Sequence, residues 1–191
     1  MTNSNTDDRD NSNENSGFAD PEKIVAEAGI KKGDVVADFG CGSGHFSFSV
    51  ADLVGESGKV FAIDILPSSL ESIDSHLKTN GINNIHPKRV DLESYGSTGL
   101  ESEEIDWVIL KNVLSQNEDK KSILDEAHRI IKTGGKVLIL AWNQENFLLG
   151  PKKELRISSE DLKHMIEDVG FIFDKNFPAG KYHYVTIATK P

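Results

Sequence analysis

Val35-Val36-Ala37-Asp38-Phe39-Gly40-Cys41-Gly42-Ser43-Gly44 is the stretch that decides the fold. It is a short, mostly apolar run that contains one acid and leads into three glycines at every second position. Such a run is typical of a buried strand, and glycines permit left-handed turns and a close approach of backbone to a ligand. Phe46, Val50 and Val54 follow at helical spacing. The stretch therefore predicts a strand, a ligand-binding turn and a helix.

The residues after this unit predict more strands and helices. Further helices are expected over 21–28, 67–80, 118–131 and 158–169, and further strands over 58–64, 84–91, 105–112 and 136–142. This alternation indicates a parallel sheet with helices on both faces. Two last strands, 171–177 and 182–189, have so short a connection that they must pair antiparallel. We predict a three-layer, Rossmann-like α/β fold whose seven-stranded, mostly parallel sheet ends in a C-terminal antiparallel hairpin.

Composition limits the possible functions. The 191 residues carry a net charge of −10, which argues against nucleic acid as the main partner because phosphates attract basic side chains. The single cysteine, Cys41, provides neither an internal disulfide nor a structural zinc site, so we expect no metal and a reducing, cytoplasmic location. No apolar run approaches the roughly 20 residues that span a bilayer. The oligomeric state stays open.

Two segments of different character divide the chain. Residues 1–17 contain nothing apolar after Met1. Such a segment cannot offset its ordering entropy by burial, so we expect a disordered polar tail. Residues 18–191 are expected to form one folded domain.

Acidic and polar residues stand where the predicted strands end. They are Asp38, Asp64, Asp91 and the pair Lys111-Asn112. Ligands bind outside the carboxyl ends of strands in open parallel sheets. The glycine spacing is G-x-G-x-G rather than the G-x-G-x-x-G of dinucleotide sites, and Asp38 would repel a diphosphate. The pattern suits a cationic, phosphate-free ligand such as S-adenosylmethionine, with Asp64 placed to accept from its ribose hydroxyls.

Five segments in order make the chain resemble the class I S-adenosylmethionine-dependent methyltransferases from about residue 18 to residue 191. They are Val36–Gly44, Val60–Ile65, Asp91-Leu92, Ile105–Val108 and Arg129–Leu138. Within this family the chain looks most like the small relatives of the quinone-biosynthesis (type 11) methyltransferases, through residues 150–158 and 181–184. It departs from many relatives at Ser115, where they carry a histidine.

The resemblance implies a set of cofactor-binding residues. Asp38 would hold the methionine ammonium directly or through water, Asp64 the ribose hydroxyls, Asp91 the adenine amino group, and Lys111 and Asn112 would line the methionine end. The complete set is Asp38, Gly40, Cys41, Gly42, Gly44, Asp64, Ile65, Asp91, Leu92, Lys111 and Asn112. Within it the glycines bring backbone against the ligand, Cys41 is small filler, and Ile65 and Leu92 pack beside the adenine.

Residues on the acceptor side are less sharply defined. The candidates are Trp142, Arg156, Tyr182, His183 and Tyr184. Each has an alternative structural interpretation, because aromatic residues pack into cores and edges and Arg156 can pair with an acid on a helix. His183 is the one candidate for a general base, which methyl transfer needs only when the nucleophile carries a proton.

These observations predict S-adenosylmethionine-dependent methyl transfer to a small organic acceptor by in-line displacement. The alternatives are a protein side-chain methyltransferase, a noncatalytic S-adenosylmethionine-binding protein with the same fold and, more distantly, a nicotinamide dehydrogenase. Arsenite is disfavoured as the acceptor because arsenite-type enzymes hold soft arsenic with several thiols, and this chain has one.

Overall fold

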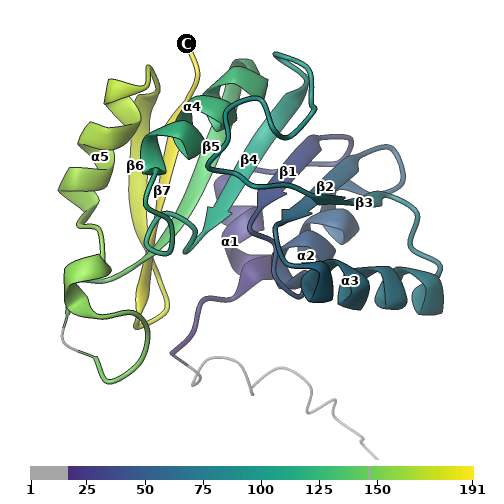
Figure 1. The fold of residues 1–191 in the computed structure, drawn as a ribbon, viewed down its shortest axis with the longest axis horizontal. Helices are drawn as coiled ribbons and strands as arrows, with labels where there is room; N and C mark the ends of the chain where they lie inside the picture. The colour runs from purple at the N-terminus through teal and green to yellow at the C-terminus, as the bar shows by residue number, and fades with distance from the viewer. Residues whose placement is uncertain (1–16, 146) are drawn as a thin grey trace, which may run out of the picture.

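A computed structural model describes residues 17–145 and 147–191, so the predicted tail lies, apart from Gly17, outside the described residues. Seven strands form one sheet with helices on its two faces (Figure 1). The strands are β1 (Val35–Phe39), β2 (Lys59–Asp64), β3 (Ile85–Arg89), β4 (Ile105–Lys111), β5 (Ile131–Trp142), β6 (Ile172–Ala179) and β7 (His183–Thr189), and the helices are α1 (Pro21–Ala28), α2 (His45–Val54), α3 (Pro67–Asn80), α4 (Lys120–Ile130), the 3-10 helix η1 (Lys153–Leu155) and α5 (Ser159–Asp168).

The strand order is β3-β2-β1-β4-β5-β7-β6. Strands β1 to β5 run parallel to one another, and β7 runs antiparallel to both β5 and β6. This arrangement confirms the predicted α/β fold with its C-terminal hairpin. The chain moves outward from β1 to β3 and then returns to the other side of β1 at β4. The order therefore reverses between β1 and β4, which is where such sheets bind ligands.

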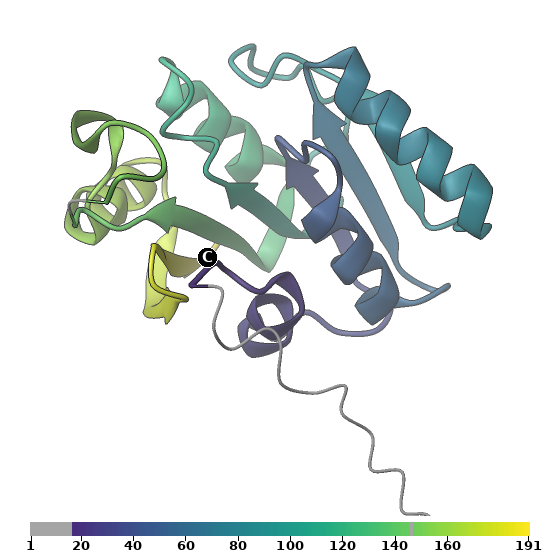
Figure 2. The same ribbon diagram turned by 90° about the horizontal axis from the view of Figure 1, so that it is seen from below.

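Two apolar clusters fill the two faces of the sheet. Ile24 of α1, Val50 of α2 and Ile73 of α3 belong to one cluster. Ile123 of α4 and Leu162 of α5 belong to the other. Figure 2 shows α1 and α4 on opposite sides of the sheet. No helix within the described residues is long and apolar enough to cross a membrane.

Strand β5 starts earlier than predicted. The pattern placed a helix to Ile131 and a strand from Lys136, with Gly134-Gly135 as the stop between them. Instead α4 ends at Ile130 and β5 begins at once. Ile131 pairs with Ile105 of β4 before the register shifts. A Cβ on Gly135 would lie 2.9 Å from the carbonyl oxygen of Asp106, so this glycine permits close contact between strands rather than ending a helix.

The crossover between β3 and β4 contains no helix, and one buried carboxylate of α4 holds it in place. Glu126 accepts hydrogen bonds from the amide of Gly96 at 2.9 Å and from the hydroxyl of Thr98 at 2.5 Å. Arg129 pairs with the same carboxylate at 2.8 Å and donates to the carbonyl of Leu100 at 2.8 Å. Side-chain bonds from α4 thus replace the helix packing that usually fixes such a connection.

Candidate functional site

The glycine turn after β1 is pressed between its neighbours. Gly40 has φ +68°, and a Cβ there would lie 2.6 Å from a methyl group of Val113, in the loop after β4. Gly44 has φ +88°, and its Cβ would meet Phe48 at 2.8 Å. The amides of Gly40 and Cys41 both donate to the carbonyl of Ile63 in β2, at 2.8 and 3.0 Å. The turn is therefore fixed against strand β2 and the loop after β4.

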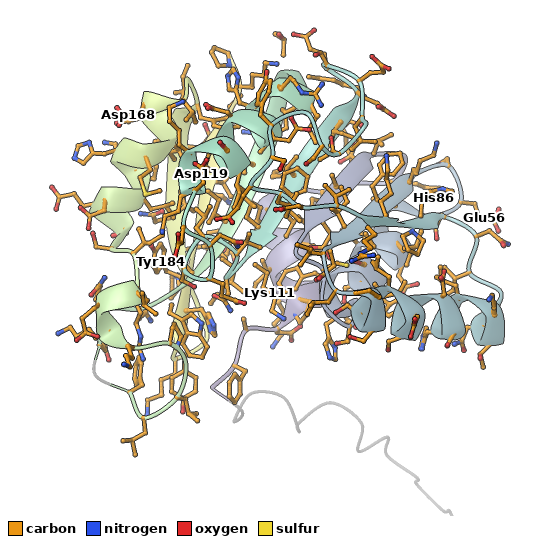
Figure 3. All side chains as sticks on the ribbon, viewed as in Figure 1. Glu56, His86, Lys111, Asp119, Asp168 and Tyr184 are labelled. Carbon is orange, nitrogen blue, oxygen red and sulfur yellow. The ribbon has the colours of Figure 1, made fainter. Side chains whose placement is uncertain are left out.

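A cavity of about 590 Å³ opens at this turn, outside the carboxyl ends of β1, β2 and β4. Nine of the eleven predicted cofactor residues line it: Gly40, Cys41, Gly42, Asp64, Ile65, Asp91, Leu92, Lys111 and Asn112. Asp38 and Gly44 do not. In Figure 3, Lys111 lies at the end of β4, far from His86 on the edge strand β3. The structure thus brings together residues that are up to 72 positions apart, from Gly40 to Asn112.

A second hollow, of about 700 Å³, lies at the other end of the sheet, where the parallel strands begin. Its lining includes Gly55, Lys59 and Asn84. It contains none of the predicted site residues. This second hollow is larger than the cavity at the glycine turn. The cavity at the glycine turn is nevertheless the candidate site, because ligands bind at the carboxyl ends of such strands.

Asp64 joins two loops of the cavity. One carboxylate oxygen accepts from the amide of Gly42 at 2.9 Å, and the other accepts from the amide of Leu66 at 2.9 Å. Each oxygen keeps a lone pair that these bonds do not use. The carboxylate is therefore held in one orientation and can still accept hydrogen bonds from hydroxyl groups of a ligand.

Asp38 lies beneath the turn and is 1% exposed. One carboxylate oxygen accepts from the hydroxyl of Ser47 at 2.6 Å, and the other has no partner within the described residues. Burial raises the pKa of Asp38 to about 6, although the Ser47 hydrogen bond and the charge of Lys111 oppose the shift. A buried carboxylate with an unpaired oxygen is costly, so Asp38 is ready to stabilise a nearby cation.

The cavity lining is rich in acids. Asp64, Asp91 and Glu93 line it beside Lys111, the one basic residue in the described lining. Burial, followed by the charges of Asp38 and Asp64, raises the pKa of the Cys41 thiol, so this thiol stays protonated. An acidic cavity repels phosphate groups and suits a ligand without them.

Sequence reasoning missed one wall of the cavity. The loop after β4 contributes Val113, Gln116 and Asn117, while Ser43, Leu66, Ser69, Val90 and Glu93 complete the lining. Asn112 begins that loop with φ +59°, a left-handed conformation that asparagine tolerates. This wall could have been predicted from a general rule, because ligands lie between the two loops that follow the strands where the strand order reverses, here β1 and β4.

None of the predicted acceptor-side residues is part of the described lining of this cavity, and of the five it is His183 that contacts a lining residue, Asn112. The ring nitrogen Nε2 of His183 lies 3.3 Å from the side-chain nitrogen of Asn112, and its ring packs against Trp142 with centroids 4.1 Å apart and the ring planes tilted by 41°. The other ring nitrogen of His183 and the side-chain oxygen of Asn112 are buried without a partner in the described chain. Burial, with the charges of Lys111 and Arg156, lowers the pKa of His183 to about 4. The imidazole is therefore neutral at pH 7.

Two other candidates make structural contacts. Arg156 is buried and donates to four loop carbonyls, among them those of Glu145 at 2.6 Å and Leu149 at 2.9 Å. Tyr184 is also buried, and its hydroxyl donates to the carbonyl of Ile157 at 2.8 Å. Tyr182 lies just before β7 and packs near Trp142. Among the candidates, His183 contacts the cavity-lining Asn112, and Trp142 contacts His183.

Comparisons with known proteins agree with this geometry. A family model described as a methyltransferase domain matches residues 30–182. A solved S-adenosylmethionine-dependent methyltransferase from Aquifex aeolicus superposes with a TM-score of 0.84 at 25% identity, covering 92% of each chain.

Two curated relatives match over shorter regions. An arsenite methyltransferase from Aquipseudomonas alcaligenes is 32% identical over 118 residues, which cover 60% of this chain and 34% of that protein. A demethylmenaquinone methyltransferase from Oceanobacillus iheyensis is 26% identical over 122 residues, which cover 62% and 49%. The chain thus spans less than half of either relative. The family model nevertheless covers most of the chain, and the chain belongs to the class I S-adenosylmethionine-dependent methyltransferases.

Proposed function

We propose that this protein transfers the methyl group of S-adenosylmethionine to a small organic acceptor by in-line displacement. The observation that carries the proposal is the acidic cavity at the glycine turn, where Asp64 has its carboxylate fixed by two amides. When bound, the cofactor supplies a methyl carbon activated by the adjacent sulfonium. The protein then has to align the acceptor and exclude water.

The residues present fit this cofactor. Asp38 lies beneath the glycine turn, and its unpaired carboxylate oxygen would stabilise the positive charge of the ammonium group from there. Asp64 would accept from the ribose hydroxyls. Ile65 and Leu66 are large apolar side chains that are half exposed at the cavity wall, and an adenine ring would cover them. Lys111 and Asn112 lie at the opposite side and would surround the methionine end.

The acceptor would enter on the side of Asn112, His183 and Trp142. With the Asn112 side-chain nitrogen donating to Nε2, Nδ1 of His183 carries the hydrogen. A general-base role requires the flipped amide, whose oxygen accepts from Nε2–H and leaves Nδ1 free to accept a proton, and the pKa of about 4 makes the ring a weak base. The pairing with Asn112 decides which ring nitrogen carries the hydrogen, because an amide nitrogen donates and an amide oxygen accepts.

A small acceptor agrees with the names of two curated relatives, an arsenite methyltransferase and a demethylmenaquinone methyltransferase. Arsenite itself is a poor candidate here because soft arsenic favours thiolate ligands. Cys41 is the one cysteine of the chain, and it lies in the proposed cofactor cavity with a protonated thiol. An organic nucleophile is the better candidate.

Calorimetric titration with S-adenosylmethionine tests the binding half of this proposal. We expect wild type to bind and Asp64→Ala to bind at least about tenfold more weakly, which is a cost of about 1.4 kcal/mol. Lys78→Ala, a change on the exposed face of α3, is the matched control. Absence of binding to wild type would contradict the proposal, and NAD titrated in parallel tests the dehydrogenase alternative.

Transfer of a labelled methyl group tests the catalytic half. The protein is incubated with labelled S-adenosylmethionine and either a metabolite extract or a mixture of peptides. We expect label in small organic products. Label in peptides would favour the protein side-chain alternative, and binding without transfer to either mixture would favour the noncatalytic one.

A further inference from the structure

The loop between β5 and α5 presents three leucine side chains to solvent. Among the described residues, Leu148 is fully exposed, Leu149 is 47% exposed and Leu155 is 54% exposed. We call residues 147–155 the leucine loop. It projects from the lower left of the molecule in Figure 1, beyond the end of β5. Exposed apolar side chains gathered in one place indicate an interaction site.

The leucine loop is held in a defined shape. Arg156 donates to the carbonyl of Pro151 at 3.0 Å and to that of Leu149 at 2.9 Å. The backbone at Gly150 lies directly on the Trp142 ring, because a Cβ there would come within 2.7 Å of it. These contacts fix the backbone of the loop in a conformation that exposes the leucine side chains.

Basic residues accompany the leucines. Lys152 and Lys153 are both exposed and directly follow the turn that presents Leu148 and Leu149. Residues 147–155 contain these two basic residues and one acid, Glu154, and the exposed Glu145 precedes them, whereas the whole chain has a net charge of −10. An adjacent pair of exposed lysines thus stands beside the exposed leucines of an otherwise acidic protein.

We propose that the leucine loop docks on an anionic lipid surface. Leucine side chains would enter the boundary between headgroups and acyl chains, and Lys152 and Lys153 would contact lipid phosphates, as interfacial segments do. A second copy of this chain is a poorer occupant, because symmetric pairing would bring these lysines together. Three leucines are also few beside the roughly 20–30 residues per side of a stable protein interface.

Docking here would turn the acceptor side of the molecule toward the lipid. Gly150 covers Trp142, which stacks on His183, and His183 contacts Asn112 at the cavity. The proposal itself does not depend on methyl transfer, since it concerns only the surface of the leucine loop.

Vesicle flotation tests the proposal with the full chain. Vesicles of phosphatidylcholine alone are compared with vesicles that contain phosphatidylglycerol, at low and high salt. We expect wild type to float with the anionic vesicles and to be released by salt. Combined Leu148→Asp and Leu149→Asp should weaken binding on the order of tenfold or more, and Lys152→Glu with Lys153→Glu by a similar factor.

Matched controls lie elsewhere on the surface. Ile172→Asp changes a similarly exposed apolar residue on β6, and Lys31→Glu with Lys32→Glu reverses another exposed lysine pair, before β1. Both controls should bind as wild type does, with thermal melting confirming that every variant folds. Failure of wild type to float, equal loss in the Ile172 control, or dimerisation that the leucine changes abolish in analytical ultracentrifugation would each overturn the proposal.

Discussion

Asp38 combines a buried charge with an unpaired oxygen, and this combination makes its effect on stability opposite to that of most acids. Burial raises its folded-state pKa to about 6 from the ordinary carboxyl value of 3.8. A raised pKa means that the folded protein holds the proton more tightly than the unfolded chain. The stability that the protonated form contributes is therefore lost as pH rises through about 6.

Asp38→Asn should stabilise the protein at pH 8 by about 1–3 kcal/mol. Asparagine removes the charge and keeps an oxygen that can accept the Ser47 hydrogen bond. Urea denaturation at pH 8 measures this gain, and the same experiment at pH 4, where Asp38 is already protonated, is the control. An equal gain at both pH values would show that the charge is not the cause.

Cofactor affinity should depend on the same titration. An ammonium group favours ionised Asp38, and only about one tenth of a group with a pKa of 6 is ionised at pH 5. We expect S-adenosylmethionine to bind about tenfold more weakly at pH 5 than at pH 7.5 in calorimetry. Methylthioadenosine, which lacks the ammonium, should show no such change, and a parallel loss for both ligands would rule out Asp38 as the source.

His183 should affect turnover more than cofactor binding. His183→Asn is expected to lower kcat by about a hundredfold or more if the ring accepts a proton from the acceptor, with the Kd for S-adenosylmethionine changed less than about twofold. Single-turnover kinetics with labelled cofactor measure the two quantities separately. Full activity in His183→Phe would instead assign the ring to packing on Trp142.

At the scale of elements, the crossover from β3 to β4 depends on one side chain of a helix elsewhere in the chain. Burial raises the pKa of Glu126, but hydrogen bonds from Arg129, Thr98 and Gly96 outweigh it and bring the pKa down to about 2. This depressed value means that the contribution to stability is present above the ordinary carboxyl range and is lost as pH falls toward 2.

Glu126→Gln should lower the free energy of unfolding at pH 7 by about 2 kcal/mol, because it leaves the partly buried Arg129 without its charge partner. Hydrogen exchange should show increased exchange in residues 94–104 of the crossover. Glu118→Gln, on an exposed position before the same helix, is the control. A change of less than about 0.5 kcal/mol would contradict the role of the network.

At the scale of the whole molecule, the sequence predicted the features that are set by residues adjacent in the chain. The glycine turn, the acids at the strand ends and the alternation of elements are local signals that gave the fold, and the resemblance to a known family added the predicted cofactor residues, nine of which line the cavity. The role of Glu126 and the four carbonyl contacts of Arg156 depend on partners brought together by folding. Asp38 shows both cases. Its place at the glycine turn was predicted from the sequence, whereas its burial beneath the turn was seen only in the structure.

Ligand binding should stabilise the whole domain by mass action. At a concentration of 100 times its Kd, S-adenosylmethionine should add about 2.7 kcal/mol to the free energy of unfolding and raise Tm by roughly 5 °C or more. Differential scanning fluorimetry measures the shift, and Asp64→Ala at the same cofactor concentration should show a smaller one. Equal shifts in both proteins would place the binding outside the cavity.

The strand order described above has a consequence for how this protein can change. The described cavity lining lies entirely between residues 40 and 117, on the side of the sheet formed by β3, β2, β1 and β4. The acceptor-side candidates come from residues 142–184, on the side formed by β5, β7 and β6. On the proposed function, selection for a new acceptor would act mainly on the second half of the chain while the first half keeps its cofactor, and the contact between Asn112 and His183 is where the two halves would constrain each other.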